Sequence, residues 1–319
     1  MDATPTPVEP TEYQPSTGRK ILYLILKIVG FAIVTFVLSL LLGGLMSYFA
    51  FDMRPVESDA DSLDDWKGNS LINIGIAAAA LLSAWFFRVR VDKLPFETLG
   101  FTGGRPFFDI FRGGLWAVLL LTMAFLILWM AGWIGVSTGN WPWVDVLGFM
   151  FFFLLISIVE EVLFRGYLMT VIAKDFSMLT ALVVSALLFG IMHLGNADFT
   201  WLGFASIVLG GYVIGLLMYK YQTIYVAIGM HWFWNFYHGN VLGFDVSGFD
   251  VPALLDIQMR GPDMLTGGEF GLEGSLITIL LLTAVSIHLS RQMGAALFQT
   301  NLIGPSDTPA TPTTPLNGP

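Results

Sequence analysis

The stretch S-I-V-E-E-V-L-F-R-G-Y-L, Ser157–Leu168, places three ionisable side chains at the end of an otherwise apolar run, Leu147–Val159. On membrane-insertion scales each central Asp, Lys or Arg costs about 2.5–3.5 kcal/mol, whereas each Leu, Ile, Phe or Val returns about 0.3–0.6 kcal/mol. If glutamate costs as much as aspartate, Glu160, Glu161 and Arg165 cancel roughly what the preceding run gains. Ionisable residues inside a membrane usually mark functional sites, so we expect this helix to carry chemistry.

The composition indicates an all-α, polytopic membrane protein. Of the 319 residues, 55% are hydrophobic and only 12% are charged. The apolar residues fall in runs of the length that a bilayer core requires. The sequence has no cysteine, which rules out disulfides and thiolate metal sites. It also has no basic patch for nucleic acid. Membrane lipid is an expected partner because of the long apolar runs.

We expect about eight transmembrane helices, with the site enclosed by the fourth, fifth and seventh. The predicted spans are 21–49, 70–87, 113–134, 144–171, 178–193, 201–219, 224–238 and 273–289. The predicted organisation is a disordered tail (1–18), three helices with loops (19–143), a four-helix core (144–240), an extramembrane loop (241–272), a final helix (273–291) and a largely disordered tail (292–319). Most Lys and Arg then fall on the side of the termini, and the positive-inside rule predicts that both termini are cytoplasmic.

The fourth predicted helix divides its charged side chains between two faces. Glu161 and Arg165 are four residues apart and share a face, whereas Glu160 points about 100° away. Glu161 can therefore pair with Arg165, which leaves Glu160 free to face a cavity as a general base. The alternative is an Arg–Glu pair that only bridges helices, with Glu160 reaching toward the surface.

Histidines and an asparagine occupy two later spans. His193 ends the fifth span, where a lone histidine is more often structural than catalytic. On the seventh span His231 and Asn235 are four residues apart, and His238 returns to nearly the same face; a polar contact between helices is the alternative interpretation. A carboxylate with an imidazole can activate a water, and an amide with a second imidazole can stabilise an oxyanion. These groups predict peptide hydrolysis by an activated water, because no nucleophile motif is present.

Three motifs on consecutive predicted helices resemble those of one known family. They are E-E-V-L-F-R-G at 160–166, F-G-I-M-H at 189–193 and H-W-F-W-N at 231–235. In order and spacing they resemble the CPBP family of intramembrane glutamic endopeptidases, which includes CAAX prenyl proteases and Abi-type bacteriocin-immunity proteins. The resemblance covers about residues 144–240, and residues 1–143 add only membrane anchoring.

The resemblance implies a role for each matching residue. Glu160 is the catalytic base, and His193 helps to orient the water. His231 and Asn235 stabilise the oxyanion. The supporting residues are Glu161 and Arg165. No cofactor is expected, although Glu160, His193 and His231 are also the types of ligand that hold zinc in a metallopeptidase.

The resemblance also implies a substrate and a location. The expected substrate is a peptide or membrane-tethered protein, prenylated or not, and the expected location is a bacterial inner (plasma) membrane. Two other classes of function stay open. A proton-coupled transporter also needs Glu and His inside the bilayer, and an immunity or scaffold protein can keep the pocket without the activity.

One difficulty concerns the depth of the candidate residues in the bilayer. Counting about 1.5 Å per residue from the predicted cytoplasmic ends, Glu160 lies about 15 Å deep, His231 about 13 Å and His193 about 24 Å. If the three residues converge, the fifth span must start deeper than predicted, or its helix must be tilted or broken.

Overall fold

A computed structural model describes residues 16–299, apart from 52–65, 103–104 and 141. Most of the predicted tails, 1–15 and 300–319, therefore lie outside the described residues. The helices are α1 (Thr17–Phe51), α2 (Trp66–Trp85), α3 (Pro106–Met130), α4 (Trp143–Glu161), α5 (Thr170–Asp175), α6 (Met178–Met192), α7 (Trp201–Tyr221), α8 (Ile224–Phe236), α9 (Asp263–Thr266) and α10 (Leu276–Met293). The strands are β1 (Ile134–Thr138) and β2 (Leu255–Met259).

The helices confirm the predicted all-α, polytopic membrane fold. Within the described part of the chain, six helices are long and apolar enough to cross a membrane. The predicted fifth and seventh spans correspond to α6 and α8, which are shorter. A 3-10 helix at Gly294–Phe298 follows α10, so the start of the predicted C-terminal tail is ordered. The bundle therefore begins at Thr17 and extends nearly to residue 299.

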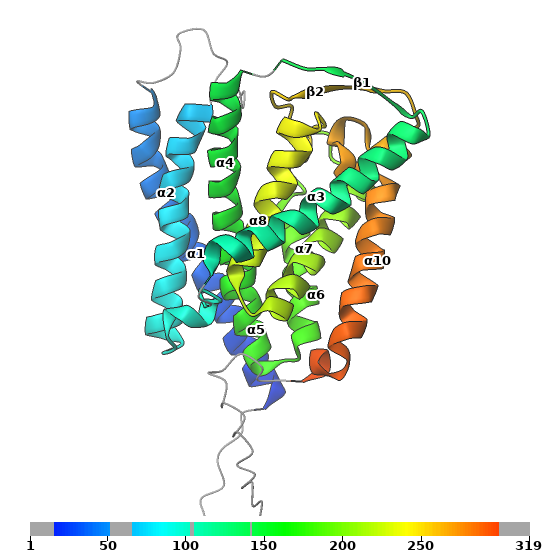
Figure 1. The fold of residues 1–319 in the computed structure, drawn as a ribbon. Helices are drawn as coiled ribbons and strands as arrows, with labels where there is room; N and C mark the ends of the chain where they lie inside the picture. Colours follow the sequence, from blue (N-terminus) through cyan, green and yellow to red (C-terminus); the bar gives the residue numbers. More distant parts are fainter. Residues whose placement is uncertain (1–15, 52–65, 103–104, 141, 300–319) are drawn as a thin grey trace, which may run out of the picture.

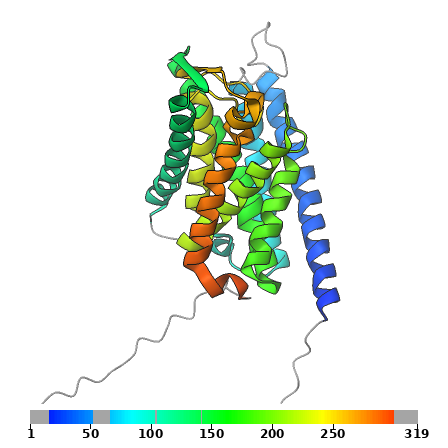
Figure 2. The ribbon, with the colours of Figure 1, turned by 90° about the vertical axis from the view of Figure 1, so that its right-hand side faces the viewer.

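The bundle has two different ends (Figures 1 and 2). At one end α1 begins, α10 ends, and tight turns join α5 to α6 and α7 to α8. We call this end the terminal face. At the other end β1 and β2 pair antiparallel, with Ile134 opposite Met259. This end, the strand face, also carries the segments 193–200 and 242–275. The small sheet was not predicted from the sequence.

The middle of the bundle is formed by α4, α6, α7 and α8, with α3 crossing α8 (Figure 1). Gly113 of α3 and Gly229 of α8 lie at this crossing, and a Cβ atom on either glycine would overlap the backbone of the other helix. Small residues allow such close approaches between membrane helices. The crossing fixes α8, which carries two of the candidate site residues, against the rest of the bundle.

The mismatch in depth between Glu160 and His193 is resolved by the length of the fourth span. Its helix does not end at residue 171, as predicted, but continues through a π-helical segment, Val162–Met169, and then α5 to Asp175. Glu160 and His193 are then each 15 residues from the terminal-face ends of their helices, Asp175 and Met178. At about 1.5 Å per residue both lie about 22 Å from that face. The fifth span therefore needs no break to reach Glu160.

Candidate functional site

One cavity of about 300 Å³ brings together the four predicted catalytic residues. Glu160 comes from α4, His193 from the end of α6, and His231 and Asn235 from α8. The predicted enclosure by the fourth, fifth and seventh spans agrees with this arrangement, but α7 and the strand-face loops also contribute walls. Further lining residues include Phe152, Ile156, Ser206, Gly210, Met230 and Phe249.

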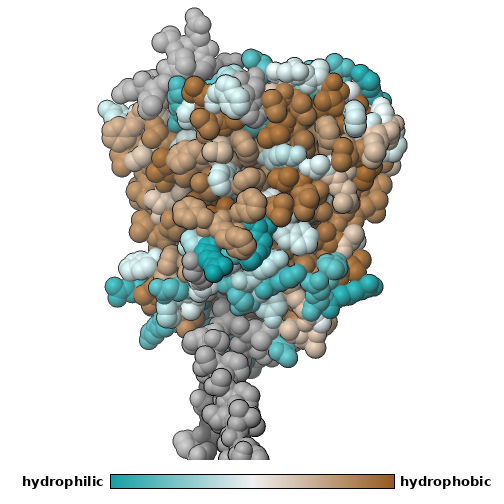
Figure 3. All heavy atoms as spheres, viewed as in Figure 1, coloured by the Kyte–Doolittle hydropathy of each residue, from teal (hydrophilic) through white to brown (hydrophobic). Residues whose placement is uncertain are grey.

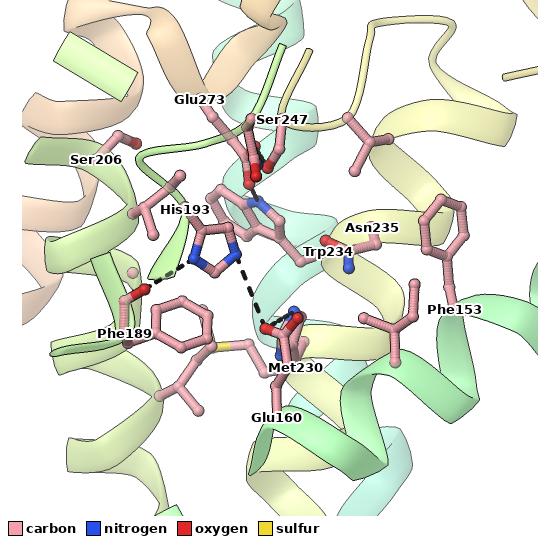
Figure 4. Close-up of a pocket in the computed structure, with 18 of the residues that line it drawn as sticks. Phe153, Glu160, Phe189, His193, Ser206, Met230, Trp234, Asn235, Ser247 and Glu273 are labelled. Carbon is pink, nitrogen blue, oxygen red and sulfur yellow. Dashed lines mark hydrogen bonds and ion pairs between the residues drawn. The ribbon is translucent and has the colours of Figure 1, made fainter. Parts of the chain in front are cut away.

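Glu160 faces two imidazoles across the cavity (Figure 4). Its Oε2 atom lies 3.8 Å from Nε2 of His193 and 3.8 Å from Nε2 of His231. That oxygen is buried and has no hydrogen-bond partner within the described structure. The distances are too long for direct hydrogen bonds, but one water can bridge groups at such a separation. Glu160 is therefore placed to share a water with a histidine.

The ring of His193 is oriented by its own helix. Its Nδ1 lies 2.8 Å from the carbonyl oxygen of Phe189, one turn earlier in α6. A carbonyl can only accept, so Nδ1 carries the proton and donates it. In the neutral ring Nε2 is then an acceptor, and it points toward Glu160 (Figure 4). Two acceptors facing one another suit a water that donates a hydrogen bond to each.

A buried charge network lies beneath the cavity. Nη1 of Arg165 donates to Oε1 of Glu161 at 3.0 Å, and Nη2 donates to the Gly211 carbonyl at 3.0 Å. Nδ1 of His231 donates to the same Glu161 oxygen at 2.8 Å. Arg165 also lies over the Phe189 ring, 4.2 Å from its centroid. Glu161 and Arg165 are almost fully buried. The charge of each is therefore stabilised by the other residue and by these hydrogen bonds.

The π-helical segment begins directly after Glu161 and includes Arg165. Inside it, the Phe164 carbonyl accepts a hydrogen bond at 3.0 Å from the Ser185 hydroxyl of α6. Short π-helical insertions in α-helices occur frequently at functional sites, because the wider turn redirects side chains. Here the wider turn lies between the carboxylates and the guanidinium. The three charged side chains in this stretch indicated a functional helix, but nothing in the sequence pattern predicted the π-helical segment.

Sequence reasoning missed a second polar group of the cavity. Glu273 accepts a hydrogen bond from the indole of Trp234 at 2.9 Å and another from the Ser247 hydroxyl (Figure 4). The sequence places Glu273 at the first position of the last predicted span, 273–289. Its neighbours in the cavity come from α8 and from the loop, so only the tertiary fold brings them together.

His238 does not belong to the cavity, although it shares a predicted stripe with His231 and Asn235. It is fully buried, and its Nε2 accepts a hydrogen bond at 3.0 Å from the Leu272 amide. The helix becomes π-helical at Tyr237–Val241, just after α8 ends. That change of pitch interrupts the periodicity on which the predicted stripe depended. His238 therefore holds the 268–275 segment against α8.

The zinc alternative uses the same donors, Glu160, His193 and His231. Structural and catalytic zinc ions take His and carboxylate ligands at about 2.0–2.2 Å. Within the described ranges, no group of three or more His, Cys, Asp or Glu side chains is arranged to hold a metal ion. Oε2 of Glu160 lies 3.8 Å from Nε2 of His193 and from Nε2 of His231, and zinc stays an alternative for these residues.

Carboxylates gather on the strand face beside the cavity. Burial raises the pKa of Asp245 from 3.8 to about 6, and the neighbouring charges of Asp250, Asp198 and Glu269 act in the same direction. Asp245 is half-buried and directly precedes the cavity-lining segment Val246–Ser247. Its ionisation therefore opposes the folded arrangement of this loop at neutral pH.

We expect Asp245→Asn to stabilise the protein at pH 7.5 and to have little effect near pH 4. The folded-state pKa of Asp245, about 6, lies above its ordinary value of 3.8. The cost of its buried charge is thus fully present above pH 6 and disappears as the pH falls below the unfolded value. Melting temperatures of the purified protein at both pH values test this. The control is Glu97→Gln, an exposed carboxylate on the terminal face; an equal shift at both pH values would contradict the prediction.

Comparison with known proteins agrees with this geometry. Residues 141–237 match the Rce1-like family model, which is described as type II CAAX prenyl endopeptidase Rce1-like. This range contains the whole of α4, α6, α7 and α8 and all four predicted catalytic residues. A comparison with curated proteins gave no match. The family match confirms the resemblance: residues 141–237 of this integral membrane protein are similar to the Rce1-like family.

Proposed function

We propose that the chain is an intramembrane endopeptidase that hydrolyses a peptide bond with a water activated by Glu160. The observation that carries this proposal is the position of the Glu160 carboxylate, 3.8 Å from two imidazole nitrogens in a largely apolar cavity. A general base must lie within reach of the proton that it removes, directly or through one water. The family match also supports peptide hydrolysis.

The water donates one hydrogen bond to Oε2 of Glu160 and one to Nε2 of His193. Glu160 takes a proton as the water oxygen attacks the peptide carbonyl, and a tetrahedral intermediate with a negative oxygen forms. When the C–N bond breaks, Glu160 returns the proton to the leaving amine. Both steps use a single carboxyl group, which begins and ends the cycle ionised.

Asn235 and His231 face the same space and stabilise the oxyanion. The Asn235 amide is a neutral donor of two N–H groups. His231 already uses Nδ1–H toward Glu161, so Nε2 donates only when the ring carries a second proton. Preorganised donors of this kind lower the barrier because they need no rearrangement as charge develops.

We expect Asn235→Ala to lower kcat by about 10²–10³-fold, the loss measured when one oxyanion donor is removed. KM should change little, because the donor acts on the intermediate and not on the bound peptide. Steady-state kinetics with a fluorogenic peptide measure both constants. Asn73→Ala on α2, whose amide donates to a carbonyl of its own helix, is the matched control. A rise in KM with unchanged kcat would show that Asn235 binds substrate instead.

The function itself is tested with the purified full chain and membrane-tethered peptides, with and without a prenyl group. Cleavage that resists chelators supports the glutamate-activated mechanism, and chelator sensitivity reversed by zinc would support a metallopeptidase. Cleavage of both peptides would extend the substrate class beyond prenylated proteins. Proton-linked uptake without cleavage would contradict the proposal and favour a transporter, and neither activity would favour an immunity or scaffold role.

A further inference from the structure

The two ends of the bundle differ in charge. Basic residues gather in the segments at the terminal face, among them Arg90, Lys93, Arg105, Lys174, Lys220 and Arg291. On the strand face, the only Lys and Arg among the described residues are Lys67 and Arg260. Acidic side chains of the strand face include Asp198, Asp245, Asp250, Asp256, Asp263 and Glu269. An apolar belt separates the two ends (Figure 3).

This asymmetry orients the protein in a membrane. Loops rich in Lys and Arg stay on the cytoplasmic side, and acidic residues contribute little to orientation. The terminal face is therefore cytoplasmic and the strand face is not. The strand-face segments 193–200 and 242–275 are both shorter than about 60 residues, the range in which the rule holds.

The cavity lies in the half of the bundle next to the strand face. Its outer wall is formed by Asn196, Ser247, Phe249 and Glu273, all in strand-face segments. Among these, Phe249 is 42% exposed. No lining residue comes from the turns of the terminal face.

The floor of the cavity closes it from the terminal face. The Glu161–Arg165 pair and its bond to Gly211 lie there, fully buried. Closely packed apolar side chains continue toward the terminal face. Among them are Val162, Met169, Leu182, Val213 and Leu217. A peptide therefore reaches Glu160 from the strand face and not through the basic end.

We propose that the site receives its substrate from the non-cytoplasmic side of the membrane. This inference rests on the proposed peptidase function and adds the compartment and class of the substrate. The scissile bond belongs to a translocated segment, such as an external loop or tail of a membrane protein. A terminus that stays in the cytoplasm, prenylated or not, is on the wrong side.

The absence of cysteine from the whole sequence allows a direct test. Single cysteines are introduced at the cavity mouth, Phe249→Cys, and on the terminal face, Glu97→Cys. Sealed membrane vesicles of both orientations, prepared from cells that make the full chain, are treated with a membrane-impermeant maleimide. We expect Phe249→Cys to react in right-side-out vesicles and Glu97→Cys only in inverted vesicles. The reverse pattern would overturn the proposal, and Asp250→Cys replaces Phe249→Cys if that variant does not fold.

A second arm separates this inference from the peptidase function. A soluble, impermeant fluorogenic peptide is added outside the same vesicles, and total activity is measured after detergent. We expect most of the total activity in right-side-out vesicles and little in sealed inverted ones. If cleavage occurs mainly in inverted vesicles, the sidedness is wrong but the function stands. If wild type cleaves nothing even in detergent, the function fails, and this inference about its substrate fails with it, although labelling still establishes the orientation.

Discussion

Glu160→Gln is expected to lower kcat for peptide cleavage by roughly 10²–10⁴-fold, the usual contribution of a general base. Glutamine keeps the size of the side chain but cannot accept a proton from water at neutral pH. The substitution also removes an acceptor that faces both His193 and His231. Because the Glu160 side chain is 25% exposed and holds no partner that the fold requires, the melting temperature should barely change.

The kinetic loss must be separated from any loss of folded protein. Active-site titration is not available without a covalent intermediate, so circular dichroism and thermal unfolding establish the folded fraction. Glu97→Gln makes the same chemical change on the terminal face and should keep full activity. Equal activity of Glu160→Gln and wild type would show that Glu160 is not the general base and would contradict the proposed reaction.

Several features of the site follow from local sequence alone. The division of labour between Glu160 and Glu161 depends only on a 100° step per residue, and Arg165 lies one turn away on the same face as Glu161. In the structure Glu161 accepts a hydrogen bond from Arg165, and Glu160 lines the cavity, as this geometry requires. The catalytic roles assigned to these residues stay predictions, since geometry shows proximity and not chemistry.

Other features depend on contacts between distant segments. The Glu273 contacts join α8 to two loop segments, and no periodicity in the sequence relates these positions. The π-helical segments likewise break the period used to place His238. Span ends are weakly determined because apolar and polar residues mix there, which explains why the fourth span continued to Asp175. The resulting error of four residues, about 6 Å, produced most of the apparent mismatch in depth between Glu160 and His193.

Arg165→Met is expected to destabilise the protein by about 3–5 kcal/mol, the cost of leaving one partner of a buried ion pair without the other. The Glu161 carboxylate would keep only its bond from His231, and the Gly211 carbonyl would lose the donated hydrogen bond. Methionine fills much of the same space, so a cavity contributes little. Reversible unfolding in mixed detergent micelles measures the free energy of unfolding.

Two further variants distinguish the charge from the packing. Arg112→Met breaks a pair of similar length, 2.9 Å to Asp109 against 3.0 Å in the buried pair, in which the arginine side chain is 34% exposed. It should cost less than Arg165→Met, about 1 kcal/mol for the partly exposed pair plus the loss of its ring contacts with Phe108 and Tyr221. The double variant Glu161→Gln, Arg165→Met removes both buried charges and should recover most of the lost stability.

Recovered stability does not imply recovered activity. In the double variant, Nδ1 of His231 faces a neutral amide instead of a carboxylate, so the ring loses the partner that fixes its orientation. The fold then returns while kcat stays low, because orienting groups around a catalytic histidine act on the reaction and not on folding. If the double variant regained both stability and full activity, the network would be structural support alone. Glu161 and Arg165 would then have no part in positioning His231.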